Sequence, residues 1–345
     1  MVIIRPIAAD DYQALYEIAN ESGIGFTSLP VNEEILRKRI AHAEASFAKK
    51  DVSKPGVEDY LFVMEDAQTK RVLGTSGIEA AVGMDNTFYC YHLGKVVHAS
   101  RELGIRNEVG TLTLCNDYTG ASEICTLFLR EEARQGANGR FLSKFRFLFI
   151  AEHRHRFSDT IIAEMRGVSD ENGSSPFWQW LEEHFFSMDF PTADYLTGIG
   201  QKVFIAELMP KYPIYVNLLS AEAQAVIGQV HEKTKPALNL LMSEGFSKGG
   251  YVDIFDGGPT VEANVNYIRT AQASRNLPIE IDAALEDAKD THFVINTRVQ
   301  EFRGVMACVK VDEERQVARI APQAAGALNL SAGEAIRFAP IHLGG

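Results

Sequence analysis

Residues 125–147, CTLFLREEARQGANGRFLSKFRF, constrain the fold more than any other part of the sequence. The run 124–129 is apolar on both faces, which is typical of a central strand covered on both sides. Small residues follow, and apolar side chains then return at helical spacing, at Phe141, Leu142, Phe145, Leu148 and Phe149. Because the first N–H groups of such a helix face the preceding loop, this pattern predicts an anion-binding site.

The loop between strand and helix is the candidate site for a pyrophosphate. Gly136, Ala137 and Gly139 have little or no side chain, so the neighbouring amides can approach a phosphate closely. Residues 130–156 hold seven Lys or Arg and three Asp or Glu, within a chain of net charge −12. A plain strand-to-helix turn is the alternative interpretation of such a loop taken alone. The candidate cofactor-binding residues of the loop are Arg134, Gln135, Gly136, Ala137, Asn138 and Gly139.

Composition narrows the classes of function. An acidic surface repels nucleic acids and anionic membranes, so neither is an expected partner. The apolar N-terminal run is broken by Arg5 and Pro6, and no long uncharged apolar stretch follows, which predicts a cytoplasmic protein without a membrane span. The four cysteines form no CxxC pair, which favours reduced thiols over a disulfide framework or a metal site.

The remaining patterns predict an α+β protein. Strands are expected at 2–6, 60–65, 72–82, 160–165 and 185–190, and helices at 10–20, 32–49 and 177–185. Residues 86–120 carry strand-like patches without a clean period and are interpreted as an insertion. Residues 191–245 are mainly helical in pattern, and short strands after about residue 290 predict a small antiparallel β module.

The order of strand, R-x-x-A-x-G loop, amphipathic helix, strand, turn and aromatic helix resembles the GNAT acyltransferase superfamily across residues 1–190. Ala137 stands where that motif usually has its first glycine. A closer resemblance covers nearly the whole chain and is to the arginine N-succinyltransferases of the alpha-subunit type. It is carried by TSLP (27–30), VHAS (97–100), CTLFL (125–129), AEMRG (163–167), SPFWQ (175–179), FFSMDF (185–190), GQKVFIAELMPKYPIY (200–215), VIGQVH (226–231) and YVDIFDGGPT (251–260).

This resemblance implies a GNAT-like mixed sheet flanked by helices. The expected domains are an acyl-CoA-binding domain at 1–190, a helical region at 191–275 that completes the active site, and an accessory β module at 276–345. The implied reaction, the first step of arginine catabolism, is succinyl-CoA plus L-arginine giving CoA and N2-succinyl-L-arginine, with L-ornithine as a second acceptor. No permanently bound cofactor is expected, since succinyl-CoA is a co-substrate. A homo-oligomer, or a hetero-oligomer with a paralogous subunit, is expected.

Four residues are singled out beyond the loop. Leu127 matches the family's succinyl-CoA contact, which must run through its backbone because its side chain is apolar. His231 matches the family's proton donor to the CoA sulfur, and only that match distinguishes it from the other eight histidines. Glu164 and Arg166 lie two apart on a predicted strand and so share a face, which suits an acceptor or succinyl pocket. A structural ion pair at a strand end is the alternative. Weaker candidates are Ser28, Asp253 and Asp256.

Two other functions remain open from sequence. The chain could be a catalytically silent subunit that binds acyl-CoA or arginine and regulates a paralogous chain, or a sensor built from the C-terminal module. The complete loop together with His231 favours an active enzyme.

Overall fold

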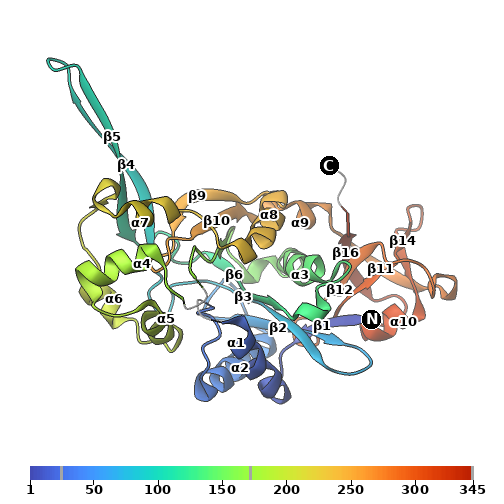
Figure 1. Cartoon of the computed structure of the whole chain (residues 1–345). Helices are drawn as coiled ribbons and strands as arrows, with labels where there is room; N and C mark the ends of the chain where they lie inside the picture. Colours follow the sequence, from blue (N-terminus) through green and yellow to red (C-terminus); the bar gives the residue numbers. More distant parts are fainter. Residues whose placement is uncertain (24–25, 171–172, 343–345) are drawn as a thin grey trace.

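The computed structural model describes residues 1–23, 26–170 and 173–342. Its strands join edge to edge in the order β14-β15-β11-β16-β12-β13-β1-β2-β3-β6-β7-β10-β9-β4-β5-β8 (Figure 1). The strands are β1 (Val2–Pro6), β2 (Asp59–Asp66), β3 (Val72–Glu79), β4 (Cys90–Ser100), β5 (Ile105–Cys115), β6 (Ser122–Leu129), β7 (Thr160–Glu164), β8 (Ile214–Tyr215), β9 (Ser247–Val252), β10 (Pro259–Asn264), β11 (Arg275–Ile281), β12 (His292–Asn296), β13 (Gly304–Ala307), β14 (Lys310–Asp312), β15 (Val317–Ile320) and β16 (Ala335–Pro340). The α-helices are α1 (Tyr12–Ser22), α2 (Glu33–Ala48), α3 (Asn138–Glu152), α4 (Pro176–Leu181), α5 (Phe190–Gly198), α6 (Val203–Leu208), α7 (Ala221–Val226), α8 (Lys235–Ser243), α9 (Arg269–Ala273) and α10 (Pro322–Ala327).

Strand β2 shows how the sheet is covered on two faces. Its residues alternate between two apolar clusters, as the period of a strand requires. Leu61 and Val63 pack with α1 and α2, whereas Phe62 packs with α3, and Phe62 and Phe145 have ring centroids 4.8 Å apart. Figure 1 shows α1 and α2 on one side of these strands and α3 on the other. The predicted α+β arrangement of a mixed sheet flanked by helices is confirmed.

Strands β6 and β7 are parallel but pair over a short length. Their register joins Ser122 to Ile161 and Glu123 to Ile162, and beyond these positions the described strands are not paired. The end of β7 turns to its other neighbour instead, where the Met165 N–H donates to the Pro259 carbonyl over 3.1 Å. The diverging ends leave an opening in the middle of the sheet.

The predicted insertion is a long antiparallel hairpin. β4 and β5 are in register from Cys90–Cys115 at the base to Ser100–Ile105 at the tip, and the hairpin projects away from the rest of the molecule (Figure 1). We call residues 94–110 the arm. Most of the arm is exposed, and Leu103 at the tip is 72% exposed.

The prediction of a strand at 185–190 is wrong. Residues Glu182–Phe186 continue helically from α4 as a π-helical turn, Ser187 adopts a left-handed conformation with φ 50°, and α5 begins at Phe190. Asp189 caps α5 by accepting a hydrogen bond from the Thr192 N–H at 2.9 Å. The two adjacent phenylalanines of this segment therefore pack as helical residues and not as a strand.

Two regions join the sheet more closely than their patterns indicate. Residues 191–275, predicted as a helical region, also supply β9 and β10. Strand β10 pairs with every residue of β7. The C-terminal strands reach the same sheet, because β13 pairs with β1. Within that C-terminal part most pairings are antiparallel, but β11 and β15 run parallel. No helix among the described residues is long and apolar enough to cross a membrane.

Candidate active site

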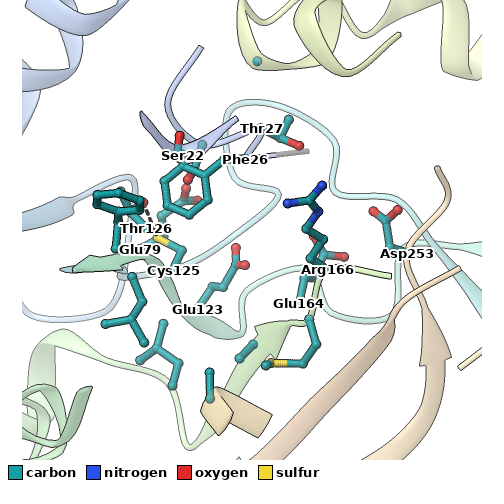
Figure 2. Close-up of a pocket in the computed structure, with 18 of the residues that line it drawn as sticks. Ser22, Phe26, Thr27, Glu79, Glu123, Cys125, Thr126, Glu164, Arg166 and Asp253 are labelled. Atoms are coloured by element: carbon teal, nitrogen blue, oxygen red, sulfur yellow. Dashed lines mark hydrogen bonds between the residues drawn. The ribbon is translucent and has the colours of Figure 1, made fainter. Parts of the chain in front are cut away.

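A cavity of about 1430 Å³ occupies the opening between β6 and β7. One end is lined by the loop that precedes α3, including Arg134, Gln135, Gly136 and Gly139. The other end holds a group of acidic side chains, several of which are labelled in Figure 2. The cavity therefore connects a helix start to an acidic chamber.

The loop before α3 turns tightly and is held by hydrogen bonds within itself. Gly136 has φ +58°, a left-handed conformation that glycine adopts without strain. The buried Asn138 side chain donates to the Ala133 carbonyl at 3.0 Å, which holds the loop closed. Ala137 and Asn138 are not part of the cavity wall among the described residues, and the Asn138 N–H already donates to the Gln135 carbonyl at 3.2 Å, so their expected phosphate contact stays a prediction.

Several of the basic side chains near the loop already have partners within the protein. Arg130 pairs with Glu17 at 2.8 Å, Lys144 with Glu244 at 2.7 Å, and Arg156 donates to the Tyr60 hydroxyl at 3.0 Å. The cations that line the cavity near the loop are Arg134 and Arg140. The seven-to-three imbalance thus overstates the charge available to a phosphate.

Leu127 lies at a distortion of β6. The register of β6 with β3 shifts between Thr75 and Gly77, and Thr126 is left-handed with φ 52°. The Thr75 hydroxyl donates to the Thr126 carbonyl at 3.1 Å and holds this bulge. A strained non-glycine residue at a bulge is typical of a functional site, because the bulge redirects the backbone groups on either side. Leu127 lines the cavity where β7 has already diverged.

Glu164 and Arg166 both line the cavity. No ion pair joins them within the described residues, which disfavours the structural alternative. Glu164 Oε1 and Arg166 Nε are buried and have no hydrogen-bond partner among the described residues. The Arg166 guanidinium points into the cavity (Figure 2), and its Nη2 donates to the Ser169 hydroxyl at 3.1 Å. Both groups are available to a ligand.

The acidic chamber holds five carboxyl groups whose pKa values are raised. Burial is the main cause for each, and repulsion from neighbouring carboxylates adds to it for all but Asp253. Burial, followed by repulsion from Glu79, raises the pKa of Glu123 to about 8. Burial, followed by Asp253, raises the pKa of Glu164 well above its usual range. Such a chamber favours a cationic ligand. Its carboxyl groups belong to Glu79, Glu123, Glu164, Asp253 and Asp256.

Asp256 has a structural part in the chamber. Its carboxylate accepts hydrogen bonds from the Gly167 N–H at 2.6 Å and the Gly258 N–H at 2.8 Å. A Cβ added at Gly258 would lie 2.1 Å from the Met165 carbonyl oxygen, so only glycine fits this crossing. Asp253 also accepts backbone hydrogen bonds, from Phe255 and Asp256. All three weaker candidates line the cavity, namely Ser28, Asp253 and Asp256.

His231 is not part of the cavity wall among the described residues, whereas Lys233 and Thr234, two and three positions later, line the cavity. Its N–H donates to the Arg166 carbonyl at 2.9 Å, which ties it to the end of β7. Its Nδ1 accepts from the Lys233 N–H at 3.1 Å, so a neutral ring carries its proton on Nε2. Burial, assisted by the positive charge of Arg166, lowers the pKa of His231.

Sequence reasoning missed several residues of the chamber and its cations. A signal was present for Glu79 and Glu123, because each is the single charge in an otherwise uncharged stretch, and for Lys202, which four apolar residues follow. Arg39 and Arg146 gave no such signal, since each has another basic residue close by in the sequence. The missed residues that line the cavity are Arg39, Glu79, Glu123, Arg146 and Lys202.

We predict that Glu123→Gln stabilises the protein at alkaline pH. The folded pKa of Glu123 is about 8, above the ordinary value of 4.5. Between these values the unfolded state releases its proton first, so this group lowers stability as pH rises, with the full effect above pH 8. The Tm gain of the variant should be larger at about pH 8.5 than at about pH 5. The exposed control Glu314→Gln should show no such difference, and equal gains at both pH values for Glu123→Gln would contradict the assignment.

Comparison with known proteins identifies the family. A family model described as arginine N-succinyltransferase beta subunit matches residues 2–270, and one for the C-terminal domain of that subunit matches residues 275–340. The chain is 48% identical to arginine N-succinyltransferase subunit beta of Pseudomonas aeruginosa, over 99% of this chain and 98% of that protein. It is 47% identical to arginine N-succinyltransferase of Yersinia enterocolitica, over 99% of both chains.

The solved structure of arginine/ornithine succinyltransferase subunit AI from Pseudomonas aeruginosa superimposes with a TM-score of 0.90 and 36% identity, over 99% of each chain. The family expected from the sequence is confirmed, but the expected subunit type is not, because the matching models and the 48% identical relative are named beta and not alpha. The chain belongs to the arginine N-succinyltransferase family.

Proposed function

We propose that this chain transfers the succinyl group of succinyl-CoA to the α-amino group of L-arginine, with L-ornithine as an alternative acceptor. The products are CoA and N2-succinyl-L-arginine, and the reaction opens the succinyltransferase route of arginine catabolism. One observation carries the proposal: a single cavity joins an anion-binding helix start to a chamber of raised-pKa acids across the gap between β6 and β7. The chain's free cysteines suit the reducing cytoplasm, where we place the reaction.

The donor lies along the opened edge of β6. The amides at the start of α3, with Arg134 and Arg140, hold the pyrophosphate of succinyl-CoA. The pantetheine arm then follows the backbone from Leu129 toward Thr126, where β7 does not occupy the hydrogen-bonding edge. Backbone N–H groups near Leu127 stabilise the oxyanion that forms at the thioester carbon.

The acceptor lies in the acidic chamber. The guanidinium and α-ammonium groups of arginine are cations, and their binding relieves the repulsion among the buried carboxylates. Glu164, with a buried unpaired oxygen, is positioned to accept a hydrogen bond from the acceptor. Arg166, with an unpaired Nε, holds the α-carboxylate of the amino acid.

Two groups handle the protons. The α-ammonium must lose a proton before its nitrogen attacks the thioester, and a carboxylate with a pKa of about 8, such as Glu123, accepts one near neutral pH. His231, with its proton on Nε2, donates to the departing CoA sulfur. Its link to Arg166 through the backbone keeps it beside the acceptor.

The test of the reaction is to incubate the purified chain with succinyl-CoA or acetyl-CoA and arginine, ornithine or lysine, following CoA release and product mass. Succinyl-arginine should form fastest. His231→Ala should lower kcat by about 100-fold, the usual contribution of a positioned acid. The exposed His155→Ala serves as a control with full activity. Full activity of His231→Ala at every pH would remove His231 from the mechanism.

Glu164 is expected to contribute to arginine binding and not to donor binding. Glu164→Gln should raise KM for arginine by about 10- to 100-fold, the loss expected for one charged hydrogen bond, while KM for succinyl-CoA stays unchanged. Steady-state kinetics with each substrate varied in turn give both constants. An unchanged KM for arginine, or equal increases in both constants, would exclude this role.

We also propose that the chain works in an oligomer, with a second copy or a paralogous subunit. Relatives are named as subunits. A two-stranded hairpin is marginally stable alone, and the arm carries exposed apolar residues at Val97, Leu103 and Ile105. Light scattering should give a mass above that of one chain, and the double substitution Leu103→Asp and Ile105→Asp should lower it. An equal mass for both proteins would show that the arm is not in the interface.

A catalytically silent subunit is the second candidate function. The complete cavity, with loop, bulge and acidic chamber, favours catalysis instead. A chain that binds CoA but gives no product with any acceptor would support the silent role.

A further inference from the structure

Arg146 is a buried cation in the wall of the active-site cavity. It lies in the middle of α3, where residues Phe141–Ile150 are all buried, and only 2% of its surface is exposed. An arginine is a poor choice for such a position unless its charge is used, because taking a guanidinium out of water is costly. It lines the cavity together with Ser143, one turn earlier on the same helix.

The hydrogen bonds of Arg146 leave part of its guanidinium available. Nε donates to the Ser143 carbonyl at 2.9 Å, Nη2 to the Ser143 hydroxyl at 3.0 Å, and Nη1 makes a long contact of 3.5 Å with the Cys125 carbonyl. A guanidinium has five N–H donors, so two remain after these three bonds. All three acceptors are uncharged, and among the described residues no carboxylate forms an ion pair with Arg146.

Burial lowers the pKa of Arg146 to about 10, so the side chain stays positively charged at neutral pH. The charge is therefore present and uncompensated within the described protein.

The position of Arg146 matches the reactive end of a bound acyl-CoA. Glu123 is the last residue of β6 that pairs with β7. The Cys125 carbonyl lies two residues beyond it, at the narrow end of the gap between these two strands. Arg146 follows Asn138, at the start of α3, by eight residues, or roughly 12 Å along the helix. A donor whose pyrophosphate binds at the helix start therefore extends its acyl group toward this side chain.

The other cations of the acidic chamber have carboxylates close by. Arg39 pairs with Asp59 at 2.9 Å. Lys202 lies close enough to Glu123 and Glu164 to offset part of the rise that burial causes in their pKa values. Burial lowers the pKa of Arg166, and the negative charges of Asp256 and Asp194 act against this shift. A second anionic group on the donor would meet repulsion in the acidic chamber, but not at Arg146.

We propose that Arg146, with the Ser143 hydroxyl, binds the terminal carboxylate of the succinyl group and thereby selects succinyl-CoA over acyl-CoAs that end in a methyl group. This inference rests on the proposed function, since it concerns the donor of that reaction. The reaction brings two free carboxylates into one cavity. Arg166 binds the carboxylate of the amino acid, and Arg146 binds the carboxylate of the acyl group.

The test compares succinyl-CoA with butanoyl-CoA, which has the same number of acyl carbons and a methyl group in place of the carboxylate. With arginine as acceptor, Arg146→Met should lower kcat/KM for succinyl-CoA by about 10- to 100-fold, the loss expected for one charged hydrogen-bond partner. The kcat/KM for butanoyl-CoA should stay unchanged or rise. Arg146→Gln, which keeps an amide donor, gives the same comparison if the methionine variant does not fold.

The control is Arg156→Met, which removes another buried arginine that does not line the cavity among the described residues. It should leave the ratio of the two kcat/KM values unchanged. An equal loss with both donors in the Arg146 variants would overturn the inference and assign Arg146 a structural role. Equal use of both donors by the unaltered enzyme would also overturn it. A failure of the proposed function looks different, because the unaltered enzyme would then form no succinyl-arginine at all.

Discussion

The active site depends on two parallel strands that stop pairing almost as soon as they meet. Every backbone N–H and carbonyl group in a sheet needs a partner, so the diverging ends of β6 and β7 must find new ones. β7 turns to β10, and β6 stays with β3 through the bulge at Thr126. The inner edge of β6 is thereby left for a ligand, and a sheet that would otherwise be a solid wall becomes a passage.

The charges around this passage are unevenly distributed. Buried carboxylates, among them Glu123 and Glu164, gather at one end, with Lys202 and Arg166 close by. The start of α3, with Arg134 and Arg140, lies at the other end. A cavity with unequal ends orients two substrates of opposite charge pattern before any chemistry begins.

The local pattern predicted the strand, loop and helix, because each is encoded by neighbouring residues. The acidic chamber could not be predicted in the same way, since Glu79, Glu123, Glu164 and Asp253 come from four segments that only the sheet order brings together. The role proposed for His231 rests on family resemblance and not on spacing. The apparent basic patch misled because Arg130 and Lys144 have acidic partners far away in sequence.

The C-terminal strands have a consequence for synthesis of the protein. Phe293 stacks on Phe141 at 5.3 Å and Phe302 packs against Phe149 at 5.2 Å, so residues near position 300 complete the packing of α3. On a ribosome adding about 5–20 residues per second, Phe302 follows the end of α3 by roughly 8–30 s. During that interval α3, which lines the cavity, has an exposed aromatic face. The growing chain therefore cannot complete the wall of this cavity before most of the chain has been made.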